Sequence, residues 1–211
     1  MNLDAEHPDP PIHDDAELRS QFGPISPLAE HKVMERLDGF CRDFIALSPF
    51  LVLASSDGQG GADASPRGDA PGFVQVLDDR TLLIPDRRGN NRIDSFVNVL
   101  SAPGVGLIFL VPGINETLRV NGPARITRDR ALLEPLAAAG KAPTIGLLVE
   151  AKEIFFHCGK ALMRSKLWDV SAQVERARFP TLGRIIAEQT RRIEVDAAEA
   201  MMEEGYRIRL Y

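Results

Sequence analysis

The chain contains little cysteine, little histidine and no excess of positive charge. Its two cysteines, Cys41 and Cys158, form no CxxC pair, so we expect buried small side chains rather than a disulfide bridge. The net charge of −5 and the pI near 5.4 argue against a general affinity for nucleic acid or anionic membrane. The four histidines are His7, His13, His31 and His157, and no spacing typical of metal ligands joins them. No protein-bound metal is therefore expected.

Long apolar runs are also missing. No stretch is long enough to span a bilayer, and residues 1–13 are acidic and Pro-rich where a signal peptide would be basic and then apolar. We therefore expect a cytoplasmic protein. The 211 residues fit one domain. We expect a loose arm at residues 1–13 and a single domain at 14–211, with helices at 14–48 and 170–206.

Short apolar and alternating segments dominate the middle of the chain. Their close spacing, with one internal helix after residue 90, favours a small closed β-barrel flanked by helices over a doubly wound sheet. The predicted class is therefore mainly β with flanking helices (α+β). Residues 129–140 are expected to form a connecting helix. The expected strands are 50–56, 62–65 as a hairpin partner, 72–77, 81–85, 104–111, 116–127 and 144–157, and residues 65–72 are expected to form a loop.

Residues 81–102 combine a strand, a Gly-containing turn and a helix. Ile93, Phe96, Val97 and Leu100 recur at helical spacing and predict one buried face. Asn90 or Asn91 is the expected N-cap of this helix, because a short side-chain oxygen can accept from the first free amides.

Three arginines flank this predicted helix start. A helix N-terminus carries unpaired amides and the positive end of the helix dipole, so Arg87, Arg88 and Arg92 beside it predict a phosphate site. The alternative is that these arginines are only solvated surface. Neither GxxxxGK[ST] nor GxGxxG is present here.

Further polar positions are expected to converge on this site. Arg119 interrupts an apolar strand, which implies either a partner or a side chain that reaches solvent on the outer face. Lys160 and Arg164 lie one helical turn apart and precede Trp168, a pattern that also fits a solvated face beside an anchoring aromatic residue. The expected set is Ser65, Arg67, Pro85, Asp86, Arg87, Asn91, Arg92, Thr117, Arg119, Lys160, Arg164 and Ser165.

Four ordered segments resemble the FMN-binding split-barrel proteins related to pyridoxamine 5'-phosphate oxidase, in particular an uncharacterised subgroup. The resemblance extends from about residue 50 to residue 169. The segments are SPRGD (65–69), IPDRRGNNRIDSFVN (84–98), NETLRVNG (115–122) and FHCGKALMRSKLW (156–168).

The resemblance implies a six-stranded antiparallel split barrel and a homodimer with FMN between the subunits. By analogy Pro85 and Asp86 line the isoalloxazine ring, and Thr117 stands where the oxidases carry a glutamine that contacts it. Lys160 and Arg164 are expected to reach the flavin from the partner subunit. The phosphate is expected at Asn91 and Arg92, with Arg67 replacing a lysine nearby.

Two departures from the oxidases bear on function. Asn91 stands in place of a basic residue, so a neighbour such as Arg87 is expected to share the phosphate charge. The chain lacks the Arg-x-His substrate motif, so pyridoxamine phosphate is not the expected substrate. The leading hypothesis is an FMN-dependent oxidoreductase acting on an unknown small molecule. The alternative is a flavin carrier or sensor without turnover; deazaflavin or haem binding, the latter through His157, ranks lower.

Overall fold

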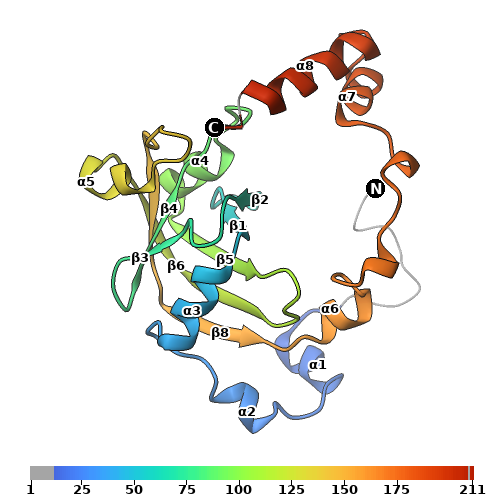
Figure 1. Cartoon of the computed structure of the whole chain (residues 1–211). Helices are drawn as coiled ribbons and strands as arrows, with labels where there is room; N and C mark the ends of the chain where they lie inside the picture. The colour runs from blue at the N-terminus through green and yellow to red at the C-terminus, as the bar shows by residue number, and fades with distance from the viewer. Residues whose placement is uncertain (1–11, 209) are drawn as a thin grey trace. The chain divides into compact units, whose positions relative to one another are not determined.

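A computed structural model describes residues 12–208 and 210–211 (Figure 1). The chain divides into two compact units between Val33 and Met34. In the first unit, α1 (Asp15–Ser20) begins where predicted, because the Asp14 carboxylate accepts from the Glu17 amide at 2.8 Å. A second short helix, α2 (Pro27–Glu30), follows. Most of the arm predicted at residues 1–13 lies outside the described residues.

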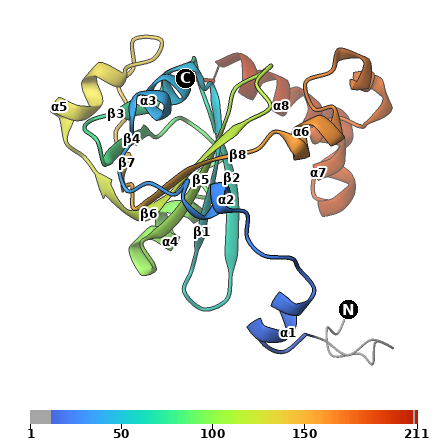
Figure 2. The same ribbon diagram turned by 90° about the horizontal axis from the view of Figure 1, so that it is seen from below.

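The second unit is built on an antiparallel sheet of eight strands. The strand order is β2-β1-β5-β6-β7-β4-β3, and β8 pairs with β6 off this path. Figure 2 shows the long hairpin of β1 and β2 running beside β5. The predicted class, mainly β with flanking helices, is confirmed. The strands are β1 (Phe50–Ser56), β2 (Ala62–Gly68), β3 (Gln75–Val76), β4 (Thr81–Pro85), β5 (Gly104–Leu110), β6 (Thr117–Thr127), β7 (Gly146–Glu150) and β8 (Glu153–His157).

The long strand β6 connects the two halves of the sheet. Its first part pairs with β5 and β8, and its second part pairs with β7. Gly122 lies between the two parts, and a Cβ at this position would meet the Glu150 carbonyl oxygen at 1.8 Å. Only glycine therefore permits the backbones of β6 and β7 to approach this closely.

The single strand predicted at 144–157 is wrong, because the chain breaks into β7 and β8. Ala151 donates its amide to the Arg80 carbonyl at 2.7 Å, and Lys152 donates to the Asn121 carbonyl at 2.8 Å. These bonds turn the chain away from β4 and toward the first part of β6. This break turns the seven strands expected from the sequence pattern into eight, where the resemblance implied six.

Two helices, α3 (Gly39–Leu47) and α4 (Asp94–Ser101), bury faces that agree only in part with the apolar spacing, which predicts Phe40, Phe44 and Leu47 on one face of α3. In α3 the buried side chains include Cys41 and Phe44, whereas Phe40 is 78% exposed. In α4 Phe96 and Val99 are buried, whereas Leu100 is 76% exposed. Both helices are apolar on more than one side, so spacing alone did not identify the face that packs on the sheet.

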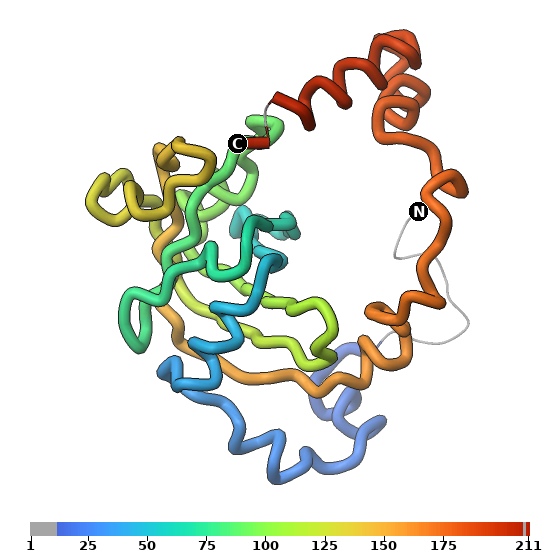
Figure 3. Tube along the Cα trace, viewed as in Figure 1, coloured from blue at the N-terminus to red at the C-terminus, as the bar shows by residue number. Residues whose placement is uncertain are grey.

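The remaining helices are short or peripheral. The helix predicted at 129–140 is confined to α5 (Arg130–Leu133) and the 3-10 helix η1 (Glu134–Leu136), which contains Pro135. Figure 3 traces α7 and α8 as neighbouring helices, and Gly183 faces the backbone of Glu199 there. The other elements are α6 (Lys160–Ser165), η2 (Val170–Ala172), η3 (Arg176–Arg178), α7 (Leu182–Thr190) and α8 (Val195–Ile208).

Alternating side chains of the strands form the core. Leu51 and Leu53 of β1 meet Leu107 and Phe109 of β5, and each of these four side chains is at most 2% exposed. Helix α4 packs against β1, β2 and β6. None of the helices among residues 12–208 is long and apolar enough to cross a bilayer.

The two cysteines differ in environment. Cys41 is fully buried in α3, and burial followed by the neighbouring Asp38 raises the pKa of its thiol to about 12. Cys158 is exposed, so the expectation of burial holds for one of the two. Both are free thiols.

Candidate functional site

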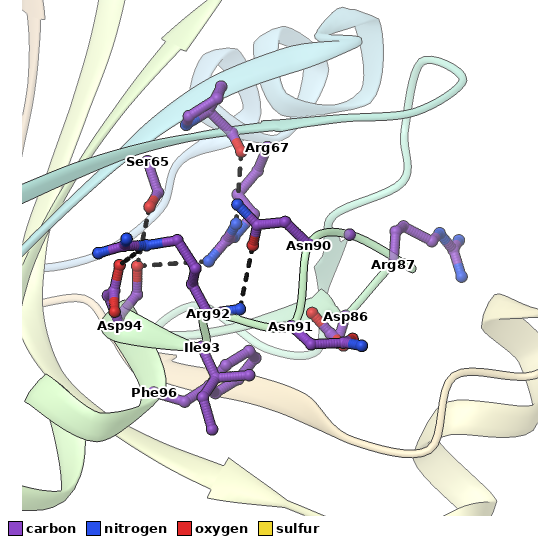
Figure 4. A pocket seen from close by; sticks show the side chains of 13 residues that line it. Ser65, Arg67, Asp86, Arg87, Asn90, Asn91, Arg92, Ile93, Asp94 and Phe96 are labelled. Carbon is purple, nitrogen blue, oxygen red and sulfur yellow. Dashed lines mark hydrogen bonds and ion pairs between the residues drawn. The ribbon is translucent and has the colours of Figure 1, made fainter. Parts of the chain in front are cut away.

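Two of the three arginines of the predicted anion site, Arg87 and Arg92, line a cavity of about 450 Å³ between β2, the loop that joins β4 to α4, and the start of α4. Arg88 does not line this cavity. Figure 4 shows the polar side chains that line it. Strand, loop and helix meet here because α4 packs back on β1 and β2. The cavity brings together half of the predicted set: Ser65, Arg67, Asp86, Arg87, Asn91 and Arg92.

One face of β2 supplies three polar side chains. Asp63, Ser65 and Arg67 alternate along the strand and are half-buried, whereas their neighbours are exposed. The loop predicted from residue 65 onward is therefore wrong in its first part, because Pro66 to Gly68 continue the strand opposite β1. A strand positions Arg67 more rigidly than a loop does.

A hydrogen-bond network joins this face of β2 to α4. The Ser95 hydroxyl donates to the Asp63 carboxylate at 2.7 Å, and the Ser65 hydroxyl donates to the same oxygen at 3.1 Å. Arg67 donates to the Ser95 hydroxyl oxygen at 3.3 Å. Sequence reasoning missed Asp63 and Ser95. The alternation of Asp63, Ser65 and Arg67 at a spacing of two residues was the signal that could have identified Asp63.

The loop before α4 has unusual backbone angles. Asn91 and Ile93 adopt φ of 59° and 55°, in the left-handed region that is costly for a β-branched residue. The predicted asparagine caps are wrong: Ile93 occupies the N-cap position, and the Asn90 side chain accepts from the Arg92 amide at 3.0 Å instead. This conformation leaves the first turn of α4, including Asp94 and Ser95, on the cavity wall.

The cavity contains acidic as well as basic groups. Arg92 donates to Asp94 at 2.8 Å, and both side chains are largely exposed. Burial raises the pKa of Asp86, although Arg67 and Arg87 oppose that shift. An exposed ion pair contributes at most about 1 kcal/mol, so Arg92 can exchange Asp94 for an anionic ligand at little cost.

Arg87 is committed to a buried ion pair with Asp69, whose side chain is only 5% exposed. It also donates to the Leu136 carbonyl at 2.9 Å. In Figure 4 its guanidinium points away from those of Arg67 and Arg92. Arg67 and Arg92 are therefore better placed than Arg87 to meet an anion in this cavity.

The Asp69 carboxylate accepts hydrogen bonds from three donors. It accepts from the Ala70 amide at 2.7 Å and from the Tyr211 hydroxyl at 2.9 Å, in addition to Arg87. Burial acts to raise the pKa of Asp69, but these three donors outweigh burial and lower the pKa below its ordinary value. The carboxylate is thus held in its charged form.

Six predicted residues lie outside the cavity lining, three of them on β4 and β6. Pro85 is buried at the end of β4, and Thr117 is 7% exposed at the start of β6. Of the two alternatives expected for Arg119, a partner or a side chain that reaches solvent, the structure shows a partner, Glu153. It lies 3.5 Å from the Glu153 carboxylate and over the Phe155 ring, 5.2 Å from its centroid.

The predicted residues of α6 lie on an exposed helix. Lys160, Arg164 and Ser165 are all exposed, and the Ser165 hydroxyl donates to the Leu162 carbonyl. Their expected approach to a partner's flavin stays a prediction. The Trp168 indole donates to the Ile114 carbonyl at 2.8 Å, which anchors the segment after α6.

Residues 37–158, more than half of the chain, match the family model of pyridoxamine 5'-phosphate oxidase. The chain therefore belongs to the pyridoxamine 5'-phosphate oxidase family. No curated protein sequence matches it.

Solved structures show distant similarity over little more than half of this chain. HupZ of Group A Streptococcus is 16% identical with a TM-score of 0.46, over 55% of this chain and 89% of that one. A putative pyridoxamine 5'-phosphate oxidase from Lactobacillus delbrueckii is 19% identical with a TM-score of 0.45, over 58% and 95%. An FMN-binding protein from Syntrophomonas wolfei is 12% identical with a TM-score of 0.44, over 56% and 83%.

The Asp69–Arg87 pair predicts a large cost on removal of one partner. Asp69→Ala should lower the free energy of unfolding by about 3 kcal/mol, because it leaves the Arg87 charge buried and uncompensated. The difference in stability between the variant and wild type should shrink as the pH falls through the lowered pKa of Asp69. Protonation of Asp69 in wild type then removes the same carboxylate charge that the substitution removes. Urea unfolding measures both effects. The control is Asp79→Ala, which breaks the exposed pair with Arg36 and should cost less than about 1 kcal/mol. Equal costs for the two variants would show that the buried pair has no special role.

The left-handed N-cap predicts that glycine is tolerated at position 93. Ile93→Gly should not lower the melting temperature, because glycine adopts φ of 55° without strain and the side chain is 57% exposed. Val97→Gly is the matched control: Val97 is 50% exposed but lies inside α4, where glycine costs about 1 kcal/mol. Thermal unfolding followed by circular dichroism measures both variants. A loss of stability in Ile93→Gly as large as in Val97→Gly would contradict the strained N-cap.

Proposed function

We propose that this protein binds FMN, with the flavin phosphate in the cavity between β2 and the start of α4, and that it is an FMN-dependent oxidoreductase. The observation that carries the proposal is the convergence of Arg67, Arg92 and the first turn of α4 on one cavity of about 450 Å³. This volume lies within the range of small-molecule sites. Membership of the pyridoxamine 5'-phosphate oxidase family supports the same assignment.

The residues present fit a phosphate. Guanidinium groups make charge-assisted bonds to phosphate oxygens, and free amides at a helix start favour anions. Arg92 is available because its bond to Asp94 is exposed, and Arg67 is available because its bond to Ser95 is long, at 3.3 Å. Asp63 accepts both serine hydroxyls, so we do not propose Ser65 and Ser95 as the main anion donors.

The other predicted residues complete the proposal by resemblance. Pro85 and Asp86, at the end of β4, would line the isoalloxazine ring, with Thr117 contacting it. Lys160 and Arg164 would come from a second copy of the chain, which makes the functional unit a homodimer. Bound FMN would supply hydride transfer, and the protein would orient the ring and exclude water. The proposed substrate is a small molecule.

Substitution of the two available arginines tests the phosphate assignment. Arg92→Ala and Arg67→Ala should each weaken FMN binding about 10-fold or more, because a hydrogen bond to a charged group is worth about 1.5–3 kcal/mol. Fluorescence titration of the flavin-free protein with FMN measures the dissociation constant. Arg130→Ala, which removes an exposed arginine of α5, should leave it unchanged.

Two results would count against this assignment. Purified protein that neither shows flavin absorption nor binds added FMN would reject the cofactor, and wild-type affinity in both arginine variants would reject the phosphate site. Photoreduction followed by reoxidation in air separates a redox-competent flavin site from an inert one.

An intersubunit flavin site predicts that FMN retention depends on protein concentration. Dilution below the dimer dissociation constant should release FMN, because the monomer lacks the partner's Lys160 and Arg164. Sedimentation velocity recorded at the flavin and protein absorbances measures both species at once. A monomer that keeps its full FMN content would show that one chain forms the whole site.

A further inference from the structure

A polar cluster lies between β2 and the start of α4. Its members are Asp63 and Ser65 of β2 and Ser95 of α4. Both serines line the cavity of about 450 Å³, whereas Asp63 does not. Ser95 is 2% exposed, so its hydroxyl depends on partners within the protein. None of the contacts proposed for FMN uses Asp63, and its carboxylate is the charged group of this cluster that still lacks a role.

The hydroxyl protons of both serines point to one oxygen of Asp63. Ser95 donates to Asp63 Oδ2 at 2.7 Å, and Ser65 donates to the same oxygen at 3.1 Å. The two serine oxygens also lie 3.1 Å apart. The ionised carboxylate is the stronger acceptor and, for Ser95, the nearer one, so it takes the Ser95 proton. A hydroxyl has a single proton, and Ser95 Oγ is therefore left as an acceptor for its other neighbours.

Arg67 uses this acceptor. Its Nη2 donates to Ser95 Oγ at 3.3 Å, and its Nη1 donates to the Pro66 carbonyl at 3.4 Å. Within the part of the chain that the structure describes, Ser95 is the only side chain that accepts a hydrogen bond from Arg67. A guanidinium has five N–H groups, so the others remain for a ligand.

Removal of Asp63 would release the Ser95 proton. The two serines would then donate to each other in either direction, because neither hydroxyl would have a charged acceptor. A Ser95 proton turned toward Arg67 would meet the protons of the guanidinium. Arg67 would thus lose its side-chain acceptor and, with it, its fixed direction.

The charge of Asp63 acts on the site in the opposite sense. The hydrogen bond to Asp94 is the largest cause of the raised pKa of Arg92, and the Asp63 charge adds to this shift. Asp63 is therefore close enough to repel an anion bound by Arg92. By charge alone, removal of Asp63 should tighten the binding of an anion. The sign of the change separates a positioning role from a purely electrostatic one.

We propose that Asp63 is a positioning residue of the phosphate site, which directs the Ser95 proton away from Arg67 and so lets Ser95 hold the guanidinium toward the cavity. The identity of the anion, FMN, rests on the proposed function. The arrangement of Asp63, Ser95 and Arg67 does not depend on it.

The first test compares FMN with riboflavin, which lacks the phosphate, by fluorescence titration of flavin-free protein. Asp63→Ala should weaken FMN binding about 3- to 10-fold, the range expected for the loss of one net hydrogen bond, and should leave riboflavin binding unchanged. Asp63→Asn keeps an oxygen acceptor for the hydroxyls and removes the charge, so it should bind FMN at least as tightly as wild type does. The control is Asp43→Ala, which removes an exposed carboxylate of α3 and should bind FMN as wild type does.

A double-mutant cycle shows whether the effect passes through Arg67. In the Arg67→Ala background, Asp63→Ala should no longer weaken FMN binding. Three results would each overturn the positioning role: equal weakening in both backgrounds, tighter FMN binding in Asp63→Ala, or an equal loss of FMN and riboflavin binding.

A measurement without ligand separates this inference from the proposed function. In flavin-free protein, the ¹⁵N heteronuclear NOE of the Arg67 Nε–H group should be lower in Asp63→Ala and Ser95→Ala than in wild type and Asp63→Asn, because the guanidinium loses its acceptor. If wild type binds no FMN but the variants show this order, the proposed function fails and the positioning role stands. Equal NOE values in wild type and Asp63→Ala would overturn the positioning role, whatever the protein binds.

Discussion

The ion pair between Asp69 and Arg87 connects the two parts of the chain that form the cavity. Asp69 follows β2 directly, and Arg87 is the second residue of the loop after β4. A buried charge costs several kcal/mol unless it is well paired, so a loop that detached would leave the Asp69 carboxylate without its partner charge. The additional bonds from Ala70 and Tyr211 to Asp69, and from Arg87 to Leu136, hold the pair from several sides. The loop between β4 and α4 is therefore held in place at its first residues.

Much of the sheet could be predicted from the sequence, because a half-buried strand has a simple period. The predicted bounds 50–56 and 81–85 agree with β1 and β4, and 116–127 agrees with β6 within a residue. The break between β7 and β8 was missed because apolar residues continue through it, and only the bonds from Ala151 and Lys152 to distant carbonyls define the corner. The buried faces of α3 and α4 were misjudged because tertiary packing chose among several apolar sides.

The candidate site was predictable in composition and less so in geometry. Clustered arginines beside a helix start indicated an anion site, and Arg67 and Arg92 do converge on one cavity. The commitment of Arg87 to Asp69 could not be read from the sequence, since the partners are 18 residues apart and belong to different motifs. The N-cap was misassigned because asparagine is the usual choice there, whereas Ile93 takes a strained angle that no propensity favours.

The loop after β4 lines two cavities, the one between β2 and α4 and a second of about 370 Å³ beside Tyr211. This shared lining imposes a thermodynamic condition on ligands of either cavity. Any ligand that shifts the loop at Gly89 or Asn91 changes the shape of both cavities, since both residues line each of them. Linkage then requires reciprocity: the factor by which the first ligand alters the affinity for the second equals the factor by which the second alters the affinity for the first. Ligand affinities measured at the two cavities would therefore report one and the same coupling free energy.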